Sequence, residues 1–351
     1  MKRRNLILNG SLVLFILIFL FSADNFFDDY PLRLINLCAI YIILGLSMNL
    51  VNGFTGLFSL GQAGFMAVGA YTTALLTMSK ATKEATFFMA PLIWPLNSIE
   101  IPFYFALIIG GILAAFVAFL IGAPVLRLKG DYLGIATLGF AEIIRIVIVN
   151  TQTVTNGALG LKGIPNDANI WWNFGIAALT VAAIVSLINS SFGRALKAIR
   201  EDEIAAESMG INLFKHKTLS FILGAFFAGI GGGLLAILQG TIAPDMFNFI
   251  LTFNILLIIV LGGMGSVSGT IISAVAITLG TEYLAVIDKP IDFGFFETPG
   301  IPGMRMVVIS AILMAVVLFY RHGLMGTKEL NWDMLIQKFS RRPLKKGGIE
   351  S

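Results

Sequence analysis

The chain has 351 residues, of which 57% are hydrophobic and 13% are charged, with a formal net charge of +4. A soluble globular domain carries about 25% charged residues. A larger soluble core cannot explain the difference, because single cores stop growing near roughly 250–300 residues. The composition excludes an ordinary soluble domain and predicts an all-α integral membrane protein. The basic residues are separated loop by loop, which indicates membrane topology and not nucleic-acid binding.

Apolar stretches recur along the whole chain. A spanning helix needs about 20 mostly apolar residues, within a range of about 17–25. The stretch 87–96 is shorter and holds two prolines, so we expect an interfacial or re-entrant piece there. We predict about ten transmembrane helices, near residues 6–22, 31–51, 57–79, 102–126, 132–150, 170–189, 218–239, 249–264, 267–287 and 303–320.

The first stretch follows three basic residues at 2–4, which also fits a signal peptide. No clear small-x-small cleavage site precedes Asp24, so we expect this span to be retained. With a cytoplasmic N-terminus, 17 of the 24 Lys and Arg residues lie on the cytoplasmic side and six on the other, while Arg145 lies inside a span. The positive-inside rule therefore predicts that both termini are cytoplasmic.

The longest charged gap between predicted spans is the segment 190–217. Its basic residues are spaced for one helix surface, and Gly210 is placed to end that helix. Its mixed charge argues against simple binding to anionic lipid and favours docking to a protein partner. The polar residues assigned to this surface are Arg194, Lys197, Arg200, Glu201, Asp202 and Glu203.

The sequence lacks the common motifs of nucleotide-binding and catalytic sites. It contains no GxxxxGK[ST] phosphate loop and no HExxH, CxxC or GxSxG motif. His216 and His322 stand alone and are interpreted as interfacial residues. We expect a protein that is not an enzyme and that holds no metal or other cofactor on its own chain.

Polar residues inside spans are the other candidates, because each charge costs a few kcal/mol on insertion. Glu142 and Arg145 share one helix face at i,i+3 spacing. They form either the polar wall of a pathway or an internal ion pair that fixes a helix contact. Asn52 and Gln62 interrupt an apolar run, as in the discontinuous helices of transport sites. The alternative there is tight packing through small residues.

Several long segments carry a family resemblance. They are VNGFTGLFSLGQAG (51–64), LRLKGDYLGIATLGFAEIIRIV (126–147), TNGALGLKGIP (155–165), GRALKAIREDEIAAESMGIN (193–212) and LGGMGSVSGT (261–270). Their order resembles the LivM-type permease family of bacterial branched-chain amino acid ABC importers, over about residues 30–325. The two Gly-rich turns, 51–64 and 260–270, are also alike, but we infer no internal repeat from them.

The resemblance implies an ABC-importer permease fold, with a transmembrane permease domain at 1–325 and a cytoplasmic tail at 326–351. The coupling loop 190–217 would insert into a cleft of an ATPase subunit. Within it, Ala205, Ala206 and Gly210 match the family's Ala-Ala-x-x-x-Gly element, whereas Ile204 replaces the usual Glu and the downstream Leu-Pro is absent.

The resemblance also implies partners and a location. The partners are a second, LivH-type permease, two cytoplasmic ATPases that bind ATP and Mg, and an extracytoplasmic solute-binding protein. The complex would lie in the bacterial cytoplasmic (inner) membrane and carry Leu, Ile or Val. The residues that we predict along the translocation pathway are Asn52, Gln62, Gly64, Thr137, Glu142, Arg145 and Asn156.

Three alternatives stay open. The same scaffold could carry urea, short amides or another small polar solute. An ion-coupled secondary transporter would work alone and would use a site such as the pair Glu142 and Arg145. A membrane-embedded enzyme would need clustered His, Asp or Ser residues, which the sequence does not show.

Overall fold

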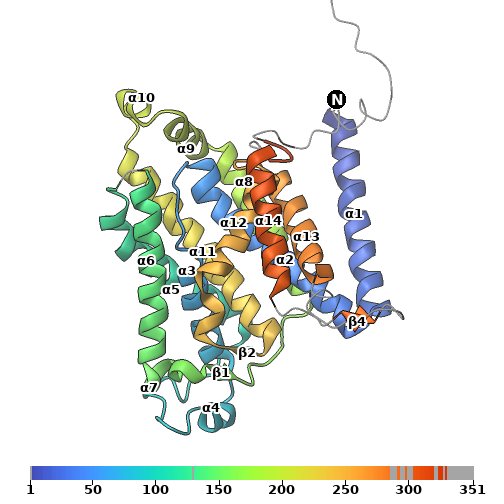
Figure 1. Cartoon of the computed structure of the whole chain (residues 1–351), viewed down its shortest axis with the longest axis vertical. Coiled ribbons are helices and arrows are strands. Elements are labelled where there is room, and N and C mark those ends of the chain that lie inside the picture. Colours follow the sequence, from blue (N-terminus) through green and yellow to red (C-terminus); the bar gives the residue numbers. More distant parts are fainter. Residues whose placement is uncertain are drawn as a thin grey trace, which may run out of the picture.

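The protein is a bundle of apolar helices (Figure 1). The computed structural model describes residues 2–128, 130–284, 291–292, 297–298, 303–319, 323–326 and 329. Most of the predicted tail 326–351 lies outside the described residues.

The longer α-helices follow one another in chain order. They are α1 (Lys2–Phe26), α2 (Asp29–Asn49), α3 (Gln62–Thr77), α5 (Phe103–Val125), α6 (Asp131–Asn150), α8 (Ile170–Asn189), α9 (Ser191–Glu201), α11 (Leu213–Gln239), α12 (Phe249–Gly262), α13 (Val267–Leu284) and α14 (Met304–Phe319).

Short elements connect these helices. The short helices are η1 (Leu50–Phe54, a π-helix), α4 (Lys80–Thr86), α7 (Gln152–Thr155), η2 (Gly157–Leu159), α10 (Glu203–Ser208) and η3 (Pro244–Phe247). The strands pair antiparallel as β1 (Leu161–Lys162) with β2 (Thr241–Ile242) and β3 (Ile291–Asp292) with β4 (Glu297–Thr298).

A helix overlaps each of the ten predicted ranges, but not all of them have the length of a span. Among the described residues, six segments are long and apolar enough to cross a membrane by length and composition: Asp29–Phe54, Phe103–Val125, Asp131–Asn150, Ile170–Asn189, Leu213–Gln239 and Val267–Leu284. The expectation of ten crossings stays a prediction.

Two sequence-based boundaries change in the structure. The range 57–79 is helical only from Gln62, because residues 55–61 form an irregular connection after η1. The stretch 87–96 contains no helix. It follows α4 at the end of the bundle that also holds α7, β1 and β2 (Figure 1). The helices α9 and α10 lie at the opposite end, together with the N-terminal end of α1 (Figure 1).

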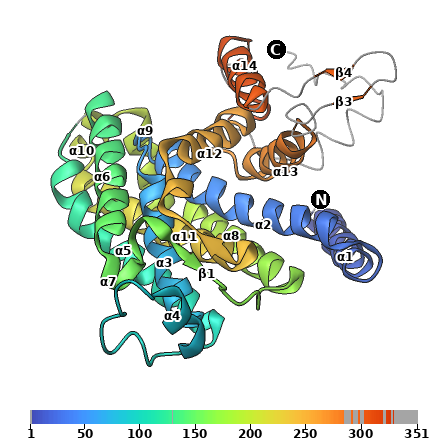
Figure 2. The same cartoon turned by 60° about the horizontal axis from the view of Figure 1, so that its bottom comes forward.

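The centre of the bundle is the crossing of α3, α5 and α11 (Figure 2). Glycines let the three backbones meet there. A β-carbon added at Gly69 would lie 2.1 Å from the carbonyl oxygen of Gly229, and one at Gly110 would lie 2.9 Å from the oxygen of Gly69. Small residues at such crossings give close van der Waals packing, which drives helix association in membranes.

The last turn of α2 widens into the π-helix η1, where the chain then leaves the helix. The Thr55 hydroxyl donates to the Leu50 carbonyl over 2.9 Å and lies 2.5 Å from the Ser220 hydroxyl on α11. These bonds satisfy polar groups that a broken helix would otherwise leave unpaired in an apolar interior. Such π-type turns inside helices often occur at functional sites.

A buried lysine organises the α4 end of the bundle. Lys83 is 1% exposed, and its ammonium donates to the carbonyls of Leu96 and Ile99. The lysine thereby holds the irregular segment 87–101 against α4. Burial lowers the pKa of this ammonium below its ordinary value of 10.5, although the carboxylate of Glu100 opposes the change.

This lowered pKa predicts a pH dependence of stability. Between the lowered pKa and 10.5 the unfolded chain binds more protons at Lys83 than the folded chain does, so stability rises with pH across that window. We expect the melting temperature of the wild type, measured relative to Lys83→Gln, to rise as pH approaches 10.5. The exposed Lys80, paired with Glu84 at 3.9 Å, is the matched position for a control, Lys80→Gln. Parallel curves for wild type and Lys83→Gln would contradict this prediction.

Candidate functional site

The polar loop between α8 and α11 folds into two short helices with defined ends. Ser190 caps α9 by accepting from the Gly193 amide at 3.3 Å, and Asp202 caps α10 by accepting from the amides of Ile204 and Ala205 at 2.8 and 3.0 Å. Gly210 ends the loop helices with a φ of 82°. The sequence prediction of a helical segment ending at Gly210 is therefore confirmed, with a break at Asp202.

The surface of α10 is open. Ile204 and Met209 are 77% and 82% exposed, whereas Ala206 is buried. The Lys217 ammonium pairs with the Glu203 carboxylate at 2.6 Å and so fixes α10 to the base of α11. A short helix with exposed apolar side chains, anchored through Glu203, is suited to insert into a groove of another protein.

Arg200 connects α9 to the transmembrane helices. Its Nη1 donates to the Gly53 carbonyl in η1 at 3.1 Å. A β-carbon added at Gly56 would lie 2.8 Å from Arg200 Cγ, and one added at Gly265 would lie 2.6 Å from Arg200 Nη1. The guanidinium also pairs with Glu201. Arg200 therefore lies between the broken helix α2 and the turn that joins α12 to α13.

Those two Gly-rich segments are in direct contact. The buried Asn49 side chain donates to the Ser266 carbonyl at 2.9 Å and to the Thr270 hydroxyl at 2.7 Å, and it accepts from the Gly265 amide at 2.8 Å. A β-carbon at Gly53 would lie 2.5 Å from the Gly265 nitrogen. Arg200 and Asn49 thus join α9, η1 and the α12–α13 turn into one polar junction.

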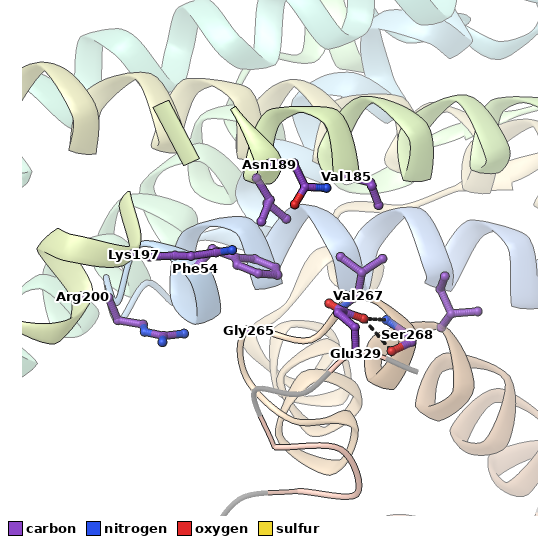
Figure 3. Close-up of a pocket in the computed structure, with 11 residues that line it drawn as sticks. Phe54, Val185, Asn189, Lys197, Arg200, Gly265, Val267, Ser268 and Glu329 are labelled. Carbon is purple, nitrogen blue, oxygen red and sulfur yellow. Dashed lines mark hydrogen bonds between the residues drawn. The ribbon is translucent and has the colours of Figure 1, made fainter. Parts of the chain in front are cut away.

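A cavity of about 510 Å³ opens beside this junction (Figure 3). Lys197 and Arg200 reach it from α9, and the Lys197 ammonium lies 5.9 Å from the centre of the Phe54 ring. Glu329 caps α13 there by accepting from the amides of Val267 and Ser268 at 2.7 and 2.9 Å. The remaining residues of the lining are Val185, Ile188, Asn189, Gly265 and Ile271.

Four of the predicted pathway residues make hydrogen bonds or close packing contacts within the chain around the break. Asn52 exchanges hydrogen bonds with the backbone of Ser59, and the Gln62 amide donates to the Ser47 hydroxyl at 2.5 Å. The Thr137 hydroxyl accepts from the Leu60 amide at 2.9 Å. Gly64 lets α3 approach α6, since its β-carbon would lie 2.9 Å from the Ala141 Cα.

Asn156 lies far from this group, at the α7 end of the bundle. It is in the left-handed region at φ 59° and donates to the Gly160 carbonyl at 2.8 Å. It therefore shapes the connection between α7 and β1. Solute contact by these five residues stays a prediction.

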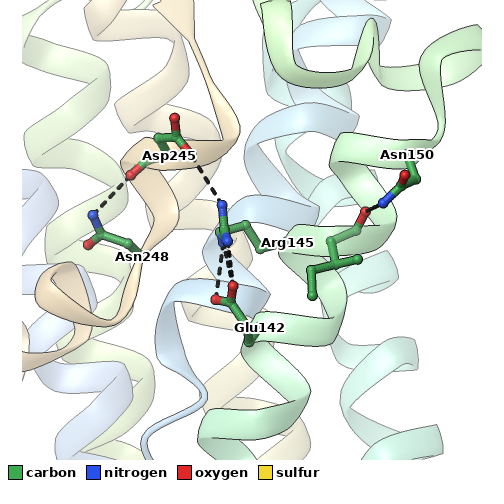
Figure 4. A network of polar contacts seen from close by, with 6 residues as sticks. Glu142, Arg145, Asn150, Asp245 and Asn248 are labelled. Carbon is green, nitrogen blue, oxygen red and sulfur yellow. Dashed lines mark hydrogen bonds and ion pairs between the residues drawn. The ribbon is translucent and has the colours of Figure 1, made fainter.

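The pair Glu142 and Arg145 is joined by a third charge (Figure 4). Arg145 Nε donates to Glu142 at 2.9 Å, and its Nη1 donates to Asp245 Oδ1 on η3 at 3.1 Å. The side chains of Glu142, Arg145 and Asp245 are 48%, 27% and 90% exposed. The ion pair predicted from the i,i+3 spacing is confirmed, but it lies at the surface of the chain. Asp245 was missed by sequence reasoning, because a Pro-Asp pair after a turn does not specify a partner 100 residues away.

These features define a multi-pass membrane protein. It has apolar helices of spanning length, a charged cluster on one of them and a polar helical loop at one end. The chain belongs to the family described as branched-chain amino acid transport system / permease component, which matches residues 30–317. This match confirms the family resemblance predicted from the sequence. No solved structure matches the chain.

Named relatives include permease proteins of Escherichia coli and Salmonella typhimurium. The chain is 36% identical over 282 residues to the high-affinity branched-chain amino acid transport system permease protein LivM of Escherichia coli K12, covering 71% of this chain and 62% of that protein. It is 36% identical over 279 residues to the LivM protein of Salmonella typhimurium, covering 70% and 61%. The Salmonella typhimurium LivH permease is 24% identical over 340 residues, covering 89% and 98%.

The chain therefore matches about three fifths of the length of the two LivM proteins. These relatives are named as permease proteins of a transport system and not as enzymes.

Proposed function

We propose that the chain is the LivM-type permease subunit of an ABC importer and forms part of the translocation pathway for the branched-chain amino acids Leu, Ile and Val. The observation that carries this proposal is the loop of α9 and α10. It presents exposed Ile204 and Met209 for docking, while Arg200 connects the same loop to the broken helix. The family membership and the names of the relatives support the same function.

The proposed topology has ten spans, with both termini and the loop of α9 and α10 in the cytoplasm of a bacterial inner membrane. The distribution of Lys and Arg supports this orientation. The N-terminal end of α1 lies at the same end of the bundle as α9 and α10, which is consistent with it (Figure 1).

The proposed partners are two cytoplasmic ATPases, which bind ATP and Mg, a LivH-type second permease and an extracytoplasmic solute-binding protein. This chain itself would carry no cofactor. The second permease would cover the exposed face of α6. A charge that faces hydrocarbon costs about 2.5–3.5 kcal/mol on insertion scales, so the surface that bears Glu142 and Arg145 must face protein or a water-filled pathway.

The test is reconstitution of the complete importer in liposomes. We expect leucine uptake that requires ATP on the ATPase side and the loaded binding protein on the other. Matched vesicles that contain this chain without the ATPases should show no uptake under an imposed proton or sodium gradient. Uptake driven by the ion gradient alone would refute the proposal and identify a secondary transporter.

A further inference from the structure

The cluster of Glu142, Arg145 and Asp245 has unused hydrogen-bonding capacity. A guanidinium carries five N–H donors. In Arg145, Nε and Nη2 each donate to Glu142, and Nη1 donates to Asp245. Two N–H groups are left without an acceptor among the described residues. Asp245 Oδ2 likewise accepts no hydrogen bond within the described part of the chain, and its side chain is 90% exposed.

The cluster is placed deep along its helix. At 1.5 Å per residue, Glu142 lies about 16 Å from the start of α6, which is about 29 Å long. Charged residues at such depth in a membrane span commonly mark solute or ion pathways. Asp245 reaches the same place from η3, directly before α12. Two segments of the bundle therefore bring opposite charges to one exposed point (Figure 4).

The unused N–H donors of Arg145 and the unused Oδ2 acceptor of Asp245 suit the two charged groups of an α-amino acid. A carboxylate accepts paired N–H donors from a guanidinium, and an ammonium donates to a carboxylate, and both are strong charge-assisted hydrogen bonds. Urea or a short amide carries no charge and would gain no charge-assisted hydrogen bond of this kind from a charge of its own. Ile143 and Ile146 are exposed beside the cluster, and Ile146 follows Glu142 at i,i+4 on the same face. They offer apolar surface for a branched side chain.

We propose that Arg145 and Asp245 recognise the α-carboxylate and the α-ammonium of the transported amino acid, and that Glu142 acts as a positioning residue for the guanidinium. This inference rests on the proposed function and names its recognition site on this chain. It also favours zwitterionic amino acids over the neutral solutes that the sequence left open.

The test is direct binding of tritiated L-leucine to the purified complex of two permeases and two ATPases, without the binding protein. For the wild type, we expect saturable binding that unlabelled leucine displaces. Two analogues should displace it at least about tenfold less well than leucine does: 4-methylpentanoate, which lacks the ammonium, and 3-methylbutylamine, which lacks the carboxylate. Urea should not displace leucine.

The variants separate recognition from structure. Asp245→Asn should weaken leucine binding at least about tenfold and leave displacement by 4-methylpentanoate unchanged, since that ligand has no ammonium to lose. Arg145→Lys should weaken leucine and 4-methylpentanoate together and spare 3-methylbutylamine. Asn150→Ala is the matched control on α6, because Asn150 donates to the Ile146 carbonyl of its own helix. It should bind leucine like the wild type.

Equal losses for all three ligands in Asp245→Asn would show a structural role and overturn the inference. Wild-type affinities in both variants, displacement by urea, or a wild-type complex that binds no leucine would overturn it as well. ATP-driven leucine uptake by the wild-type importer tests the proposed function separately. If uptake is present and the variants bind normally, only the recognition site is refuted.

Discussion

Gly69→Ala is expected to disrupt the centre of the bundle and to lower the free energy of unfolding by about 3 kcal/mol or more. The new methyl group would lie 2.1 Å from the Gly229 carbonyl oxygen and 2.4 Å from the Gly229 Cα. Backbone atoms cannot rotate away as a side chain does, so α3 and α11 would have to separate. The separation would also open the contact of both helices with α5 at Gly110.

The measurement is thermal unfolding in detergent, followed by tryptophan fluorescence, together with the monodisperse fraction on gel filtration. Gly175→Ala on α8 is the matched control, because nothing lies within 4 Å of its added β-carbon. Like Gly69→Ala, this control replaces a glycine by an alanine within an apolar helix. Alanine favours helix over glycine by about 1 kcal/mol, so the control should be neutral or slightly stabilising. Equal melting temperatures for Gly69→Ala and wild type would contradict the close backbone crossing.

In the proposed importer, Arg200→Ala is expected to reduce ATP-driven uptake at least about tenfold, while the proposed ATPase subunits remain bound. The expected size follows from the loss of hydrogen bonds to a charged group, each worth roughly 1.5–3 kcal/mol. The substitution removes the bond to the Gly53 carbonyl and the packing against Gly56 and Gly265. The substitution leaves the exposed residues of α10 unchanged. The ATPase should therefore still dock, but its movement should no longer be transmitted from α9 to η1.

The readouts are subunit co-purification, ATP hydrolysis and leucine uptake on the same preparation. Hydrolysis should continue, with weaker stimulation by the loaded binding protein. Arg200→Lys keeps the charge but loses the planar guanidinium, so its leucine uptake should lie between that of the wild type and that of Arg200→Ala. Arg127→Ala is the control, since Arg127 is exposed and makes no ion pair or hydrogen bond within the described part of the chain. Unchanged uptake in Arg200→Ala, or loss of the ATPases from the complex, would contradict a role in transmission.

Local features of the sequence were sufficient for the helices and for the polar loop. A helix overlaps each of the ten predicted ranges because apolar length and helical hydrogen bonding are properties of a single segment. The end of α10 at Gly210 was predictable for the same reason, since glycine adopts positive φ at helix ends without a steric penalty. The i,i+3 pair of Glu142 and Arg145 is also a local feature.

The candidate site was only partly predictable. Asn52, Gln62 and Thr137 were chosen because polar residues at membrane depth are costly, but that cost does not say whether a solute or other groups of the chain satisfy their hydrogen bonds. In the structure their partners are Ser59, Ser47 and the Leu60 amide. The likeness of the two Gly-rich turns did not indicate that they touch each other.

The sequence by itself determined a helical membrane protein with one charged helical loop, because composition, span length and helix-ending residues act within a few turns of chain. The tertiary structure alone decided that Arg200 contacts η1, that Asn49 binds the α12–α13 turn and that Asp245 joins Arg145. Each of these contacts joins residues 100 or more positions apart. No periodicity specifies such a partner, since it depends on how glycine-lined helices pack and on which polar group lies close enough to satisfy another.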